Sequence, residues 1–438
     1  MVTPTEAILD FAAAPHVLPP QVAADARRLL ADTLACGVAG STAPGADGVL
    51  AAAKVWGSGD DCRVLGRAQR LPAPAAAFVN GFQIHCLEWD AVHEPAVVHA
   101  MSVVTAALLA VIDRRGGCDP DEALTALAVG VDIASGLGIS ATSGLKFFRP
   151  ATAGVIGAAL ACARIDGLPH DRFADVLGLA YSQAAGTMQA HVEGSITLPL
   201  QVAAAARAAV TALDLVTYDL TGPHNALEGP FGYFKLIDDG SPAAYARDLG
   251  KIWRIAEIST KPYPSGRASH AVLSTLQRLQ AEHRFTAADV VSIDARVPVL
   301  IHRLVGRPWV DDMTPAYARL CVPFLAALML TDGRIDPRKF TAKAFGDPGL
   351  RALGAKLAVT VDANPDPNAL GPQSLSLRLA DGRNFDIAIP HTLGAPNNPL
   401  TAAETAAKLA FCEELAAEPI ADRRLFDDPA AFVATATR

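Results

Sequence analysis

Apolar residues recur at helical spacing through the first half of the chain, from about residue 20 to residue 215. A repeat of three to four residues predicts helices that each bury one face. The repeat is broken at 41–47, 57–61, 85–100 and 143–154, where Gly, Pro and polar residues cluster. We therefore predict that this half of the chain forms an all-helical domain.

Helix starts are marked by capping sequences. TPTE (3–6) and TAAE (401–404) are capping boxes, in which a Thr and a Glu three residues later satisfy each other's backbone N–H groups. DPDE (119–122) has Asp at the cap and Pro at the first helical position. Each of these sequences predicts a helix, and the helix from Thr401 lies beyond the strand-like region described next.

After about residue 262 the repeat changes from that of helices to that of strands. Residues 290–302, 356–363 and 374–390 alternate between apolar and polar positions. In the last of these segments Asp381-Gly382 predicts a hairpin turn between two strands that bury the same face. The pattern indicates a second, smaller α/β domain.

Composition limits the class of protein. Of 438 residues, 51% are hydrophobic and 19% are charged, which disfavours extended disorder. The longest apolar run, 100–112, is too short to cross a bilayer, and the N-terminus lacks a signal-peptide pattern. Seven scattered cysteines without a CxxC pair indicate reduced thiols in the cytoplasm. A net charge of −8 without a basic block argues against nucleic acid or a membrane as partner.

One stretch, HCLEWDAVHEPAVVHA (85–100), concentrates ionisable residues in a chain that has few. Asp90, His93 and His99 are candidates for moving protons near neutral pH. Pro95 interrupts any helix that would align the histidines, and their spacing is not that of HExxH, so we predict no metal. The alternative is a polar loop whose side chains cap neighbouring helices.

A second stretch, KPYPSGRASH (261–270), lies where the repeat changes. Its prolines exclude a helix, which places Lys261, Arg267 and His270 on a stiff segment between domains. Three potential cations there suit a carboxylate, although a hinge whose cations pair with surface acids is an equal alternative. The chain has no GxxxxGK[ST], GxSxG or strand-linked GxGxxG, so we predict no nucleotide or redox cofactor.

The ordered set of motifs resembles the MmgE/PrpD family, which includes 2-methylcitrate dehydratase, cis-aconitate decarboxylase and iminodisuccinate epimerase. The stretches that carry the resemblance are 64–90, 93–110, 149–168, 220–234, 261–270 and 389–401. The resemblance implies a mainly α fold, with a helical domain over 1–262 completed by 400–438 and an α/β lid domain over 263–399. It also implies a homodimer whose interdomain cleft works on a small di- or tricarboxylic acid.

The resemblance assigns roles to residues. Asp90 and His99 resemble the aspartate and the following histidine of the family's D-F-D-D-T-H…H-P-S stretch, and Lys261 resembles the first lysine of its K-P-Y-P segment. These three are the predicted catalytic residues. The predicted substrate-binding residues are Glu88, His93, Arg149, Gln201, Arg267 and His270.

Several positions depart from the family pattern. They are Glu88, Ala91 and Val92 in the first motif, Arg149 and Gln201 in place of His, Leu198 in place of Lys, and Phe324 in place of Tyr. An arginine at 149 exchanges a titratable group for a permanent cation, which favours carboxylate binding over proton relay. The alternative for Arg149 is an ion pair with Glu88 or Glu193.

The remaining groups still allow a base beside cations that stabilise an enediolate. The leading hypothesis is a hydro-lyase that dehydrates a small hydroxy acid by α-proton abstraction. Its rivals are an epimerase that returns the proton to the same carbon, and a catalytically silent binding homologue. Decarboxylation ranks lower, because Leu198 and Phe324 remove polar groups that such members display.

Overall fold

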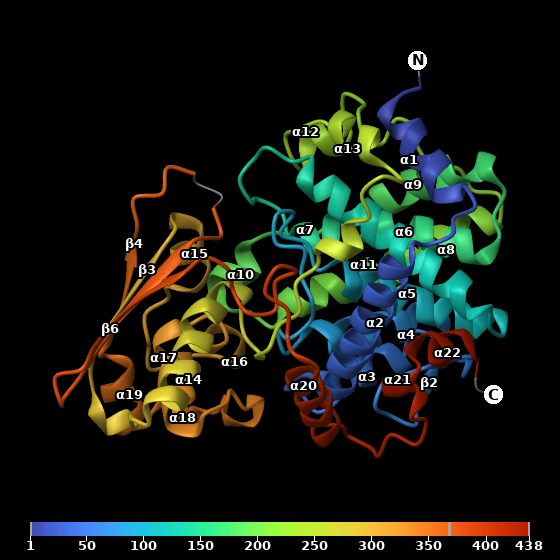
Figure 1. Ribbon diagram of the computed structural model, residues 1–438. Helices are drawn as coiled ribbons and strands as arrows, with labels where there is room; N and C mark the ends of the chain where they lie inside the picture. Colours follow the sequence, from blue (N-terminus) through green and yellow to red (C-terminus); the bar gives the residue numbers. More distant parts are fainter. Residues whose placement is uncertain (1, 367–368, 437–438) are drawn as a thin grey trace.

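The structure is a computed structural model that describes residues 2–366 and 369–436. It is built mainly from helices, which confirms the mainly α part of the predicted fold class, and the four strands between residues 290 and 389 lie at one end of the molecule (Figure 1). Buried side chains form a large core among the helices of the first half of the chain and a second core around a sheet of the second half.

The large core is surrounded by helices of the first 250 residues. The longer ones are α1 (Pro4–Ala13), α2 (Pro20–Gly40), α3 (Ala46–Lys54), α4 (Ala73–His85), α5 (Ala100–Arg115), α6 (Pro120–Ile139), α8 (Gly154–Asp166), α9 (Phe173–Tyr181) and α11 (Thr197–Thr217). Shorter ones are α7 (Arg149–Thr152), α10 (Gln189–Glu193), α12 (Tyr233–Leu236) and α13 (Ala243–Asp248). Small residues let these helices approach closely: a Cβ at Gly157 of α8 would lie 2.3 Å from the carbonyl oxygen of Gly130 in α6.

The predicted caps are confirmed. Thr3 and Glu6 form a capping box at α1, and Thr401 and Glu404 form one at α20 (Ala402–Glu414). At α6 the side chain of Asp119 accepts hydrogen bonds from two backbone N–H groups of the first turn. These local signals fixed the helix starts because they satisfy backbone donors that otherwise have no partner.

Three details differ from the prediction. A short antiparallel pair, β1 (Cys62–Arg63) with β2 (Arg70–Leu71), interrupts the part predicted to be all helical. The predicted strand at 290–302 ends at Val297, because Pro298 caps helix α15 (Val299–Val305). His270, predicted on a non-helical segment, is the first residue of helix α14 (His270–His283), which follows a short 3-10 turn.

The second core packs against a four-stranded sheet with the order β4-β3-β5-β6. The strands are β3 (Val290–Val297), β4 (Leu357–Val361), β5 (Gln373–Leu379) and β6 (Asn384–Ile389). β4 runs parallel to β3, whereas β5 and β6 form the predicted antiparallel hairpin, with Gly382 at φ 90° in its turn. Leu375, Leu377 and Leu379 are buried on one face of it, as predicted.

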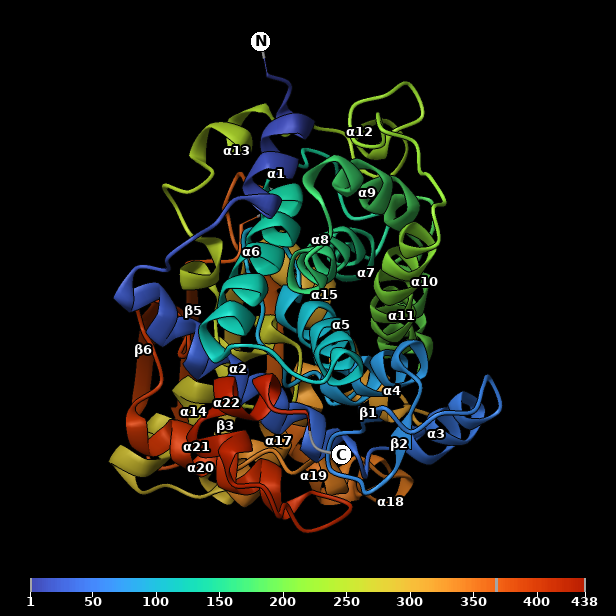
Figure 2. The ribbon, with the colours of Figure 1, turned by 90° about the vertical axis from the view of Figure 1, so that its right-hand side faces the viewer.

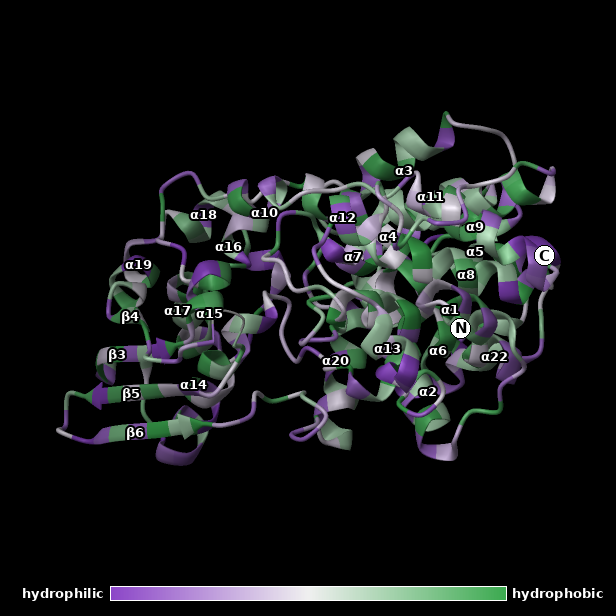
Figure 3. Cartoon of the chain, turned by 90° about the horizontal axis from the view of Figure 1, so that it is seen from above, coloured by the Kyte–Doolittle hydropathy of each residue, from purple (hydrophilic) through white to green (hydrophobic). Residues whose placement is uncertain are grey.

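Helices of the second half of the chain pack against this sheet or beside it (Figure 3). They are α14, α15, α16 (Pro315–Ala318), α17 (Val322–Asp332), α18 (Ala342–Phe345) and α19 (Pro348–Gly354). The division into domains at residues 262 and 400 remains a prediction, because shared cores show which side chains pack together and not which parts fold alone.

The end of the chain returns to the large helical part, where α20, α21 (Arg424–Asp427) and α22 (Pro429–Ala434) lie near α2 (Figure 2). Lys408 of α20 is buried, with Nζ 2.6 Å from Oδ1 of Asp32 in α2. The same Nζ donates to the carbonyl oxygen of Trp89 at 3.0 Å. The last helices are therefore tied both to α2 and to the loop at 86–99.

Two helices, α6 and α11, are long and apolar enough to cross a membrane by length and composition. In α6, 89% of the apolar window is buried inside the protein, and in α11 the figure is 56%. Packing within the helical core accounts for much of this apolar character, so the two helices are weak evidence for a membrane span.

Candidate active site

A pocket lies between the two cores, and both predicted motif regions border it. Its empty space, counted together with the open solvent at its mouth, amounts to about 820 Å³. The first half of the chain contributes Glu88, Val92, Glu94, Val97, His99, Leu145, Phe148, Arg149, Pro150, Met188, His191 and Leu198. The second half contributes Gly266, Arg267, Ala268, Ile301, Leu304, Val305, Leu320, Leu370, Gln373 and Thr392.

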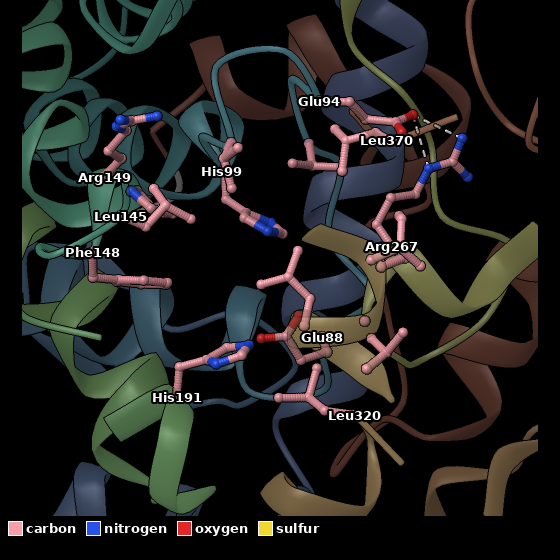
Figure 4. A pocket seen from close by; sticks show the side chains of 18 of the residues that line it. Glu88, Glu94, His99, Leu145, Phe148, Arg149, His191, Arg267, Leu320 and Leu370 are labelled. Carbon is pink, nitrogen blue, oxygen red and sulfur yellow. Dashed lines mark hydrogen bonds and ion pairs between the residues drawn. The ribbon is translucent and has the colours of Figure 1, made fainter. Parts of the chain in front are cut away.

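Asp90 is the centre of a buried hydrogen-bond network beside this pocket. Its Oδ2 atom lies 2.9 Å from Nδ1 of His85 and 2.9 Å from Nδ1 of His99, and it accepts a third bond from the Ser102 hydroxyl. Because Nδ1 of His99 faces a carboxylate, it carries the hydrogen, and Nε2 of His99 is left as the basic nitrogen. His99 lines the pocket and points into it (Figure 4).

The network sets distinct charge states. Burial alone would raise the pKa of Asp90, but His85 and His99 hold it well below its usual range. Burial lowers the pKa of His99 and outweighs the opposing effect of Asp90, so His99 is neutral at pH 7 and can act as a base. Burial also lowers the pKa of His85, but the carboxylates of Asp90 and Glu88 have the larger effect, so its pKa is raised overall.

Asp90 itself has no exposed surface and is not among the pocket-lining residues that the structure describes. A buried, ionised carboxylate bonded to two imidazoles positions them and stabilises an imidazolium. The position of Asp90 thus suits a residue that orients His99 and does not itself contact the ligand. The assignment of Asp90 and His99 to catalysis remains a prediction, with Asp90 as the orienting residue and His99 as the base.

Glu88 and Lys261 form a buried ion pair at the pocket. Nζ of Lys261 lies 3.1 Å from Oε2 of Glu88 and donates to the Glu88 carbonyl oxygen at 2.9 Å. Burial opposes ionisation of Glu88, but Lys261 and the two nearby histidines lower its pKa to about 2. Glu88 faces the pocket, while Lys261 is fully buried and does not line it among the described residues. Lys261 thus contacts a residue of the pocket wall, and its assignment to catalysis remains a prediction.

His191 of α10 is a pocket residue that sequence reasoning missed. Nη2 of Arg307 lies 3.1 Å from its Nδ1, so Nδ1 is an acceptor and Nε2 carries the hydrogen. Burial and the charge of Arg307 lower the pKa of His191 to about 4. Figure 4 shows His99, Glu88 and His191 converging on one space. The lone histidine in HVEGS carries no motif, and only the fold brings it to this site.

Arg149 lines the pocket and is paired with Asp238, not with Glu88 or Glu193 as the alternative interpretation had it. Its Nε lies 3.1 Å from Oδ2 of Asp238, and its Nη2 lies 3.1 Å from Oδ1. Nη2 also donates to the carbonyl oxygen of Ser143 at 2.8 Å. Within the described part of the chain, Nη1 has no hydrogen-bond partner and can hold one oxygen of a ligand.

Arg267 also lines the pocket, on the opposite side from Arg149 (Figure 4). Its Nε and Nη2 each lie 2.9 Å from Oε1 of Glu94. Its Nη1 donates to the carbonyl oxygen of Leu393 at 2.5 Å, and Nη2 also contacts that of Thr392 at 3.3 Å. All three of its nitrogens are thus occupied by the protein.

Three predicted binding residues lie outside the pocket, as far as its described lining shows. His93 is buried, with Nε2 2.9 Å from Oε2 of Glu257, and its Nδ1 accepts from the backbone of its own loop. His270 is buried against Ser265, with Nε2 3.0 Å from the hydroxyl. Gln201 accepts a hydrogen bond from the backbone N–H of Thr187 at 2.6 Å. Each contact supports local structure.

Three side chains could together hold a metal ion, because His85, Asp90 and His99 offer ligand atoms within 4.8 Å of one another. Two imidazoles and a carboxylate suit several transition metals. The carboxylate oxygen, however, already accepts hydrogen bonds from both histidines and from Ser102. This arrangement also serves proton transfer without an ion, and the absence of a metal remains a prediction.

Comparison with known proteins identifies the family. Residues 8–246 match the MmgE/PrpD N-terminal domain, and residues 263–424 match the MmgE/PrpD C-terminal domain. The chain belongs to the MmgE/PrpD family. This confirms the resemblance that the ordered motifs indicated, and it places the two matched regions on either side of the pocket.

Curated members of the MmgE/PrpD family are similar to this chain at low identity. Cis-aconitate decarboxylase of Homo sapiens is 27% identical over 375 residues, covering 82% of this chain and 76% of the relative. Cis-aconitate decarboxylase-like protein oryM of Aspergillus oryzae is 25% identical, covering 87% and 85%. Cis-aconitate decarboxylase of Aspergillus terreus is 24% identical, covering 86% and 82%.

The two most apolar departures from the MmgE/PrpD pattern have different surroundings. Leu198 lines the pocket near the start of α11, where it supplies no charge. Phe324 is fully buried in the second core, with its ring 5.1 Å from that of Trp309 and 5.4 Å from that of Phe340. Leu198 thus changes the site itself, whereas Phe324 belongs to the core behind it.

Proposed function

We propose that this MmgE/PrpD protein is a carbon–oxygen lyase that dehydrates a small hydroxy acid by removing the proton next to its carboxylate. The observation that carries the proposal is the Asp90–His99 pair, in which Nδ1 of a neutral His99 is held at 2.9 Å by the carboxylate while the ring faces the pocket. A histidine held in this way is unprotonated near pH 7 and can accept a proton as a general base.

The groups at the site support a balanced sequence of bond changes. Nε2 of His99 takes the α-proton, and Asp90 stabilises the resulting imidazolium. The electron pair of the broken C–H bond forms the new double bond as the β C–O bond breaks. The imidazolium returns its proton to the departing hydroxyl, which leaves as water, while Nε2–H of His191 orients that oxygen. Nη1 of Arg149 holds the substrate carboxylate and its developing charge.

Epimerisation is the second candidate, and the polarity of the pocket favours it over decarboxylation. Leu198 provides no proton donor, and Glu88, with a pKa of about 2, is ionised and cannot act as an acid. With His99 as its one base, the site suits epimerisation, in which the proton taken from carbon is returned to carbon and no separate acid is needed for a leaving group. Decarboxylation, the reaction in the names of the curated relatives, ranks below both, and a silent binding homologue is the non-enzymatic alternative.

Proton NMR in D₂O tests the proposal. The purified protein is incubated with citrate, 2-methylcitrate, malate, tartrate and 3-hydroxybutanoate, with His99→Gln as the paired variant. We expect vinyl signals from wild type and a loss of rate of roughly 10³-fold in the variant. Deuterium at the α-carbon without vinyl signals would establish epimerisation instead. No change with any acid would favour the silent homologue.

We also propose that the chain works as a homodimer in the cytoplasm. Exposed apolar side chains on or next to α3, α10, α11 and α12 support the dimer, since such patches are uncommon on monomers, and these four helices lie along one side of the molecule (Figure 2). They are Trp56, Val192, Ile196, Tyr218, Leu220, Phe231 and Leu236. Light scattering on the purified protein should give twice the chain mass, and a monomer at micromolar concentration would refute the dimer.

A further inference from the structure

We propose that the substrate carries a single carboxylate on an apolar body, and is not a tricarboxylic acid. This inference rests on the proposed function, because it concerns the ligand of the same pocket. It follows from how the charged groups around the pocket are already paired, and from the apolar walls that remain.

The positive charges at the pocket are largely used by the protein. All three guanidinium nitrogens of Arg267 donate hydrogen bonds to Glu94 or to the backbone carbonyls of Thr392 and Leu393. Lys261 is bound to Glu88 and does not reach the pocket lining. Among the pocket-lining cations that the structure describes, only Arg149 keeps a nitrogen without a protein partner, Nη1. Of the two arginines that line the pocket, Arg149 thus offers an unpartnered nitrogen to one carboxylate, whereas the charge of Arg267 is paired with Glu94.

Two further cations lie near the pocket without lining it. Arg319, next to Leu320, is buried over the ring of Phe340 at 5.2 Å. Arg307 sits over the ring of Tyr317 at 5.0 Å and donates to His191. Neither arginine is among the described residues that line the pocket, although Nη1 of Arg307 and Nε and Nη2 of Arg319 have no hydrogen-bond partner in the described part of the chain. They add a positive potential there but no direct contact for a second carboxylate.

The pocket also contains its own negative charge. Glu88 and Glu94 both line it. The pKa of Glu88 is about 2, so this carboxylate is ionised at neutral pH. A substrate with three carboxylates would bring them near these groups in a site of low exposure, and like charges there repel strongly. Since burying an unpaired carboxylate is costly, the site disfavours polyanions.

The remaining walls are apolar. Ile301, Leu304 and Val305 of α15 face the pocket from the second core, and Phe148, Leu198 and Leu320 extend this surface. Burial of alkyl groups against such walls gains free energy with each methylene. The pocket thus fits a carboxylic acid whose carboxylate meets Arg149 and whose alkyl part lies on the α15 side.

Isothermal titration of the full-length protein with four inert acids tests the ligand class. The acids are butanoate, hexanoate, succinate and propane-1,2,3-tricarboxylate. We expect hexanoate to bind roughly fifteenfold more tightly than butanoate, because each of its two additional buried methylenes contributes about fourfold. Succinate and the tricarboxylate should bind more weakly than either. Tighter binding of the tricarboxylate than of hexanoate would overturn the proposal.

A charge-insertion variant sharpens the test. Leu198→Lys places a cation in the pocket and should strengthen tricarboxylate binding at least tenfold while weakening hexanoate binding. Val17→Lys, at a side chain that is 95% exposed and outside the described pocket lining, adds the same charge as a control. Equal effects of both variants would mean that net charge alone governs binding. If Leu198→Lys does not fold, the wild-type series still decides.

The outcomes separate this inference from the proposed function. Incubation of 3-hydroxyhexanoate in D₂O reports on turnover of a single-carboxylate acid. Tight hexanoate binding with no deuterium uptake or vinyl product would leave the ligand class standing and refute the lyase. Dehydration of citrate or malate alone, with no binding of hexanoate, would support the lyase and refute the single-carboxylate class.

Discussion

Oδ2 of Asp90 lies 2.9 Å from Nδ1 of His99, and Asp90 has no exposed surface. The carboxylate therefore fixes the tautomer of His99 and directs Nε2 to the pocket. In Asp90→Asn the side chain keeps its shape, but its amide N–H can donate to Nδ1 of His99. Nδ1 then becomes the acceptor, and Nε2 carries the hydrogen and can no longer take a proton. We expect kcat/KM to fall by roughly 10²- to 10⁴-fold with little change in ligand binding. A near-normal rate would remove Asp90 from the mechanism.

A pH dependence of stability follows from His191. Its pKa is about 4 in the folded protein and about 6.5 when unfolded. Between these values the unfolded chain binds the proton and the folded chain does not, so stability is lost as pH falls from about 6.5 to 4. The slope for one proton is roughly 1.4 kcal/mol per pH unit.

Urea unfolding from pH 7.5 to 4.5 measures this slope. His191→Gln should be less sensitive to acid by about one proton over that window. The exposed His391→Gln is the matched control, and it should unfold as the wild type does at every pH. An unchanged slope in His191→Gln would show that His191 takes up its proton as readily in the folded protein as in the unfolded chain.

Features that depend on local sequence were predictable. The capping boxes at Thr3 and Thr401 and the hairpin turn at Asp381-Gly382 are confirmed, because each is decided by residues within a few positions. The pairing of Cys62–Arg63 with Arg70–Leu71 was missed. Two-residue strands show no alternation that a sequence pattern could reveal.

Features of the site that depend on side-chain direction were not predictable. His191 reaches the pocket from a short helix, and Arg149 pairs with Asp238, which is 89 positions away. His270 belongs to the expected motif yet is buried outside the described pocket lining, where Ser265 contacts its Nε2. The motifs located the site, but tertiary packing decided which of their side chains face it.

Lys261 should act as a positioning residue for Glu88. Because Nζ lies 3.1 Å from Oε2 of Glu88, Lys261→Met leaves a carboxylate in the pocket wall without its main partner and raises its pKa. We expect kcat/KM to fall and its pH profile to gain an ionisation above about 4.5, the usual range of a glutamate. Lys261→Arg should restore the wild-type profile in part.

The control for this experiment is Lys235→Met, which removes an exposed lysine on α12. The double variant Glu88→Gln with Lys261→Met should lack the added ionisation, because the titrating carboxylate is gone. If the ionisation persists in the double variant, it belongs to another group. If Lys261→Met shows the wild-type pH profile, Lys261 does not control Glu88.

Chelation tests whether His85, Asp90 and His99 hold a metal. Their nitrogen and oxygen atoms already hydrogen-bond to one another, so we expect dialysis against EDTA to leave kcat/KM unchanged. Elemental analysis of the untreated protein should find far less than one metal ion per chain. Loss of activity that returns with a single added transition metal would establish a metal centre at these three residues.

The buried pair between Lys408 and Asp32 should govern the docking of the C-terminal helix. Both side chains are at most 3% exposed, and their closest atoms are 2.6 Å apart. Lys408→Met alone leaves the buried carboxylate of Asp32 without its ion-pair partner. We expect this to lower the free energy of unfolding by about 3–5 kcal/mol, measured by urea unfolding. The double variant Asp32→Leu with Lys408→Met removes both charges and should recover most of that loss. Additive losses would mean that the two charges do not stabilise each other and that the contact of Lys408 with the Trp89 carbonyl carries its effect.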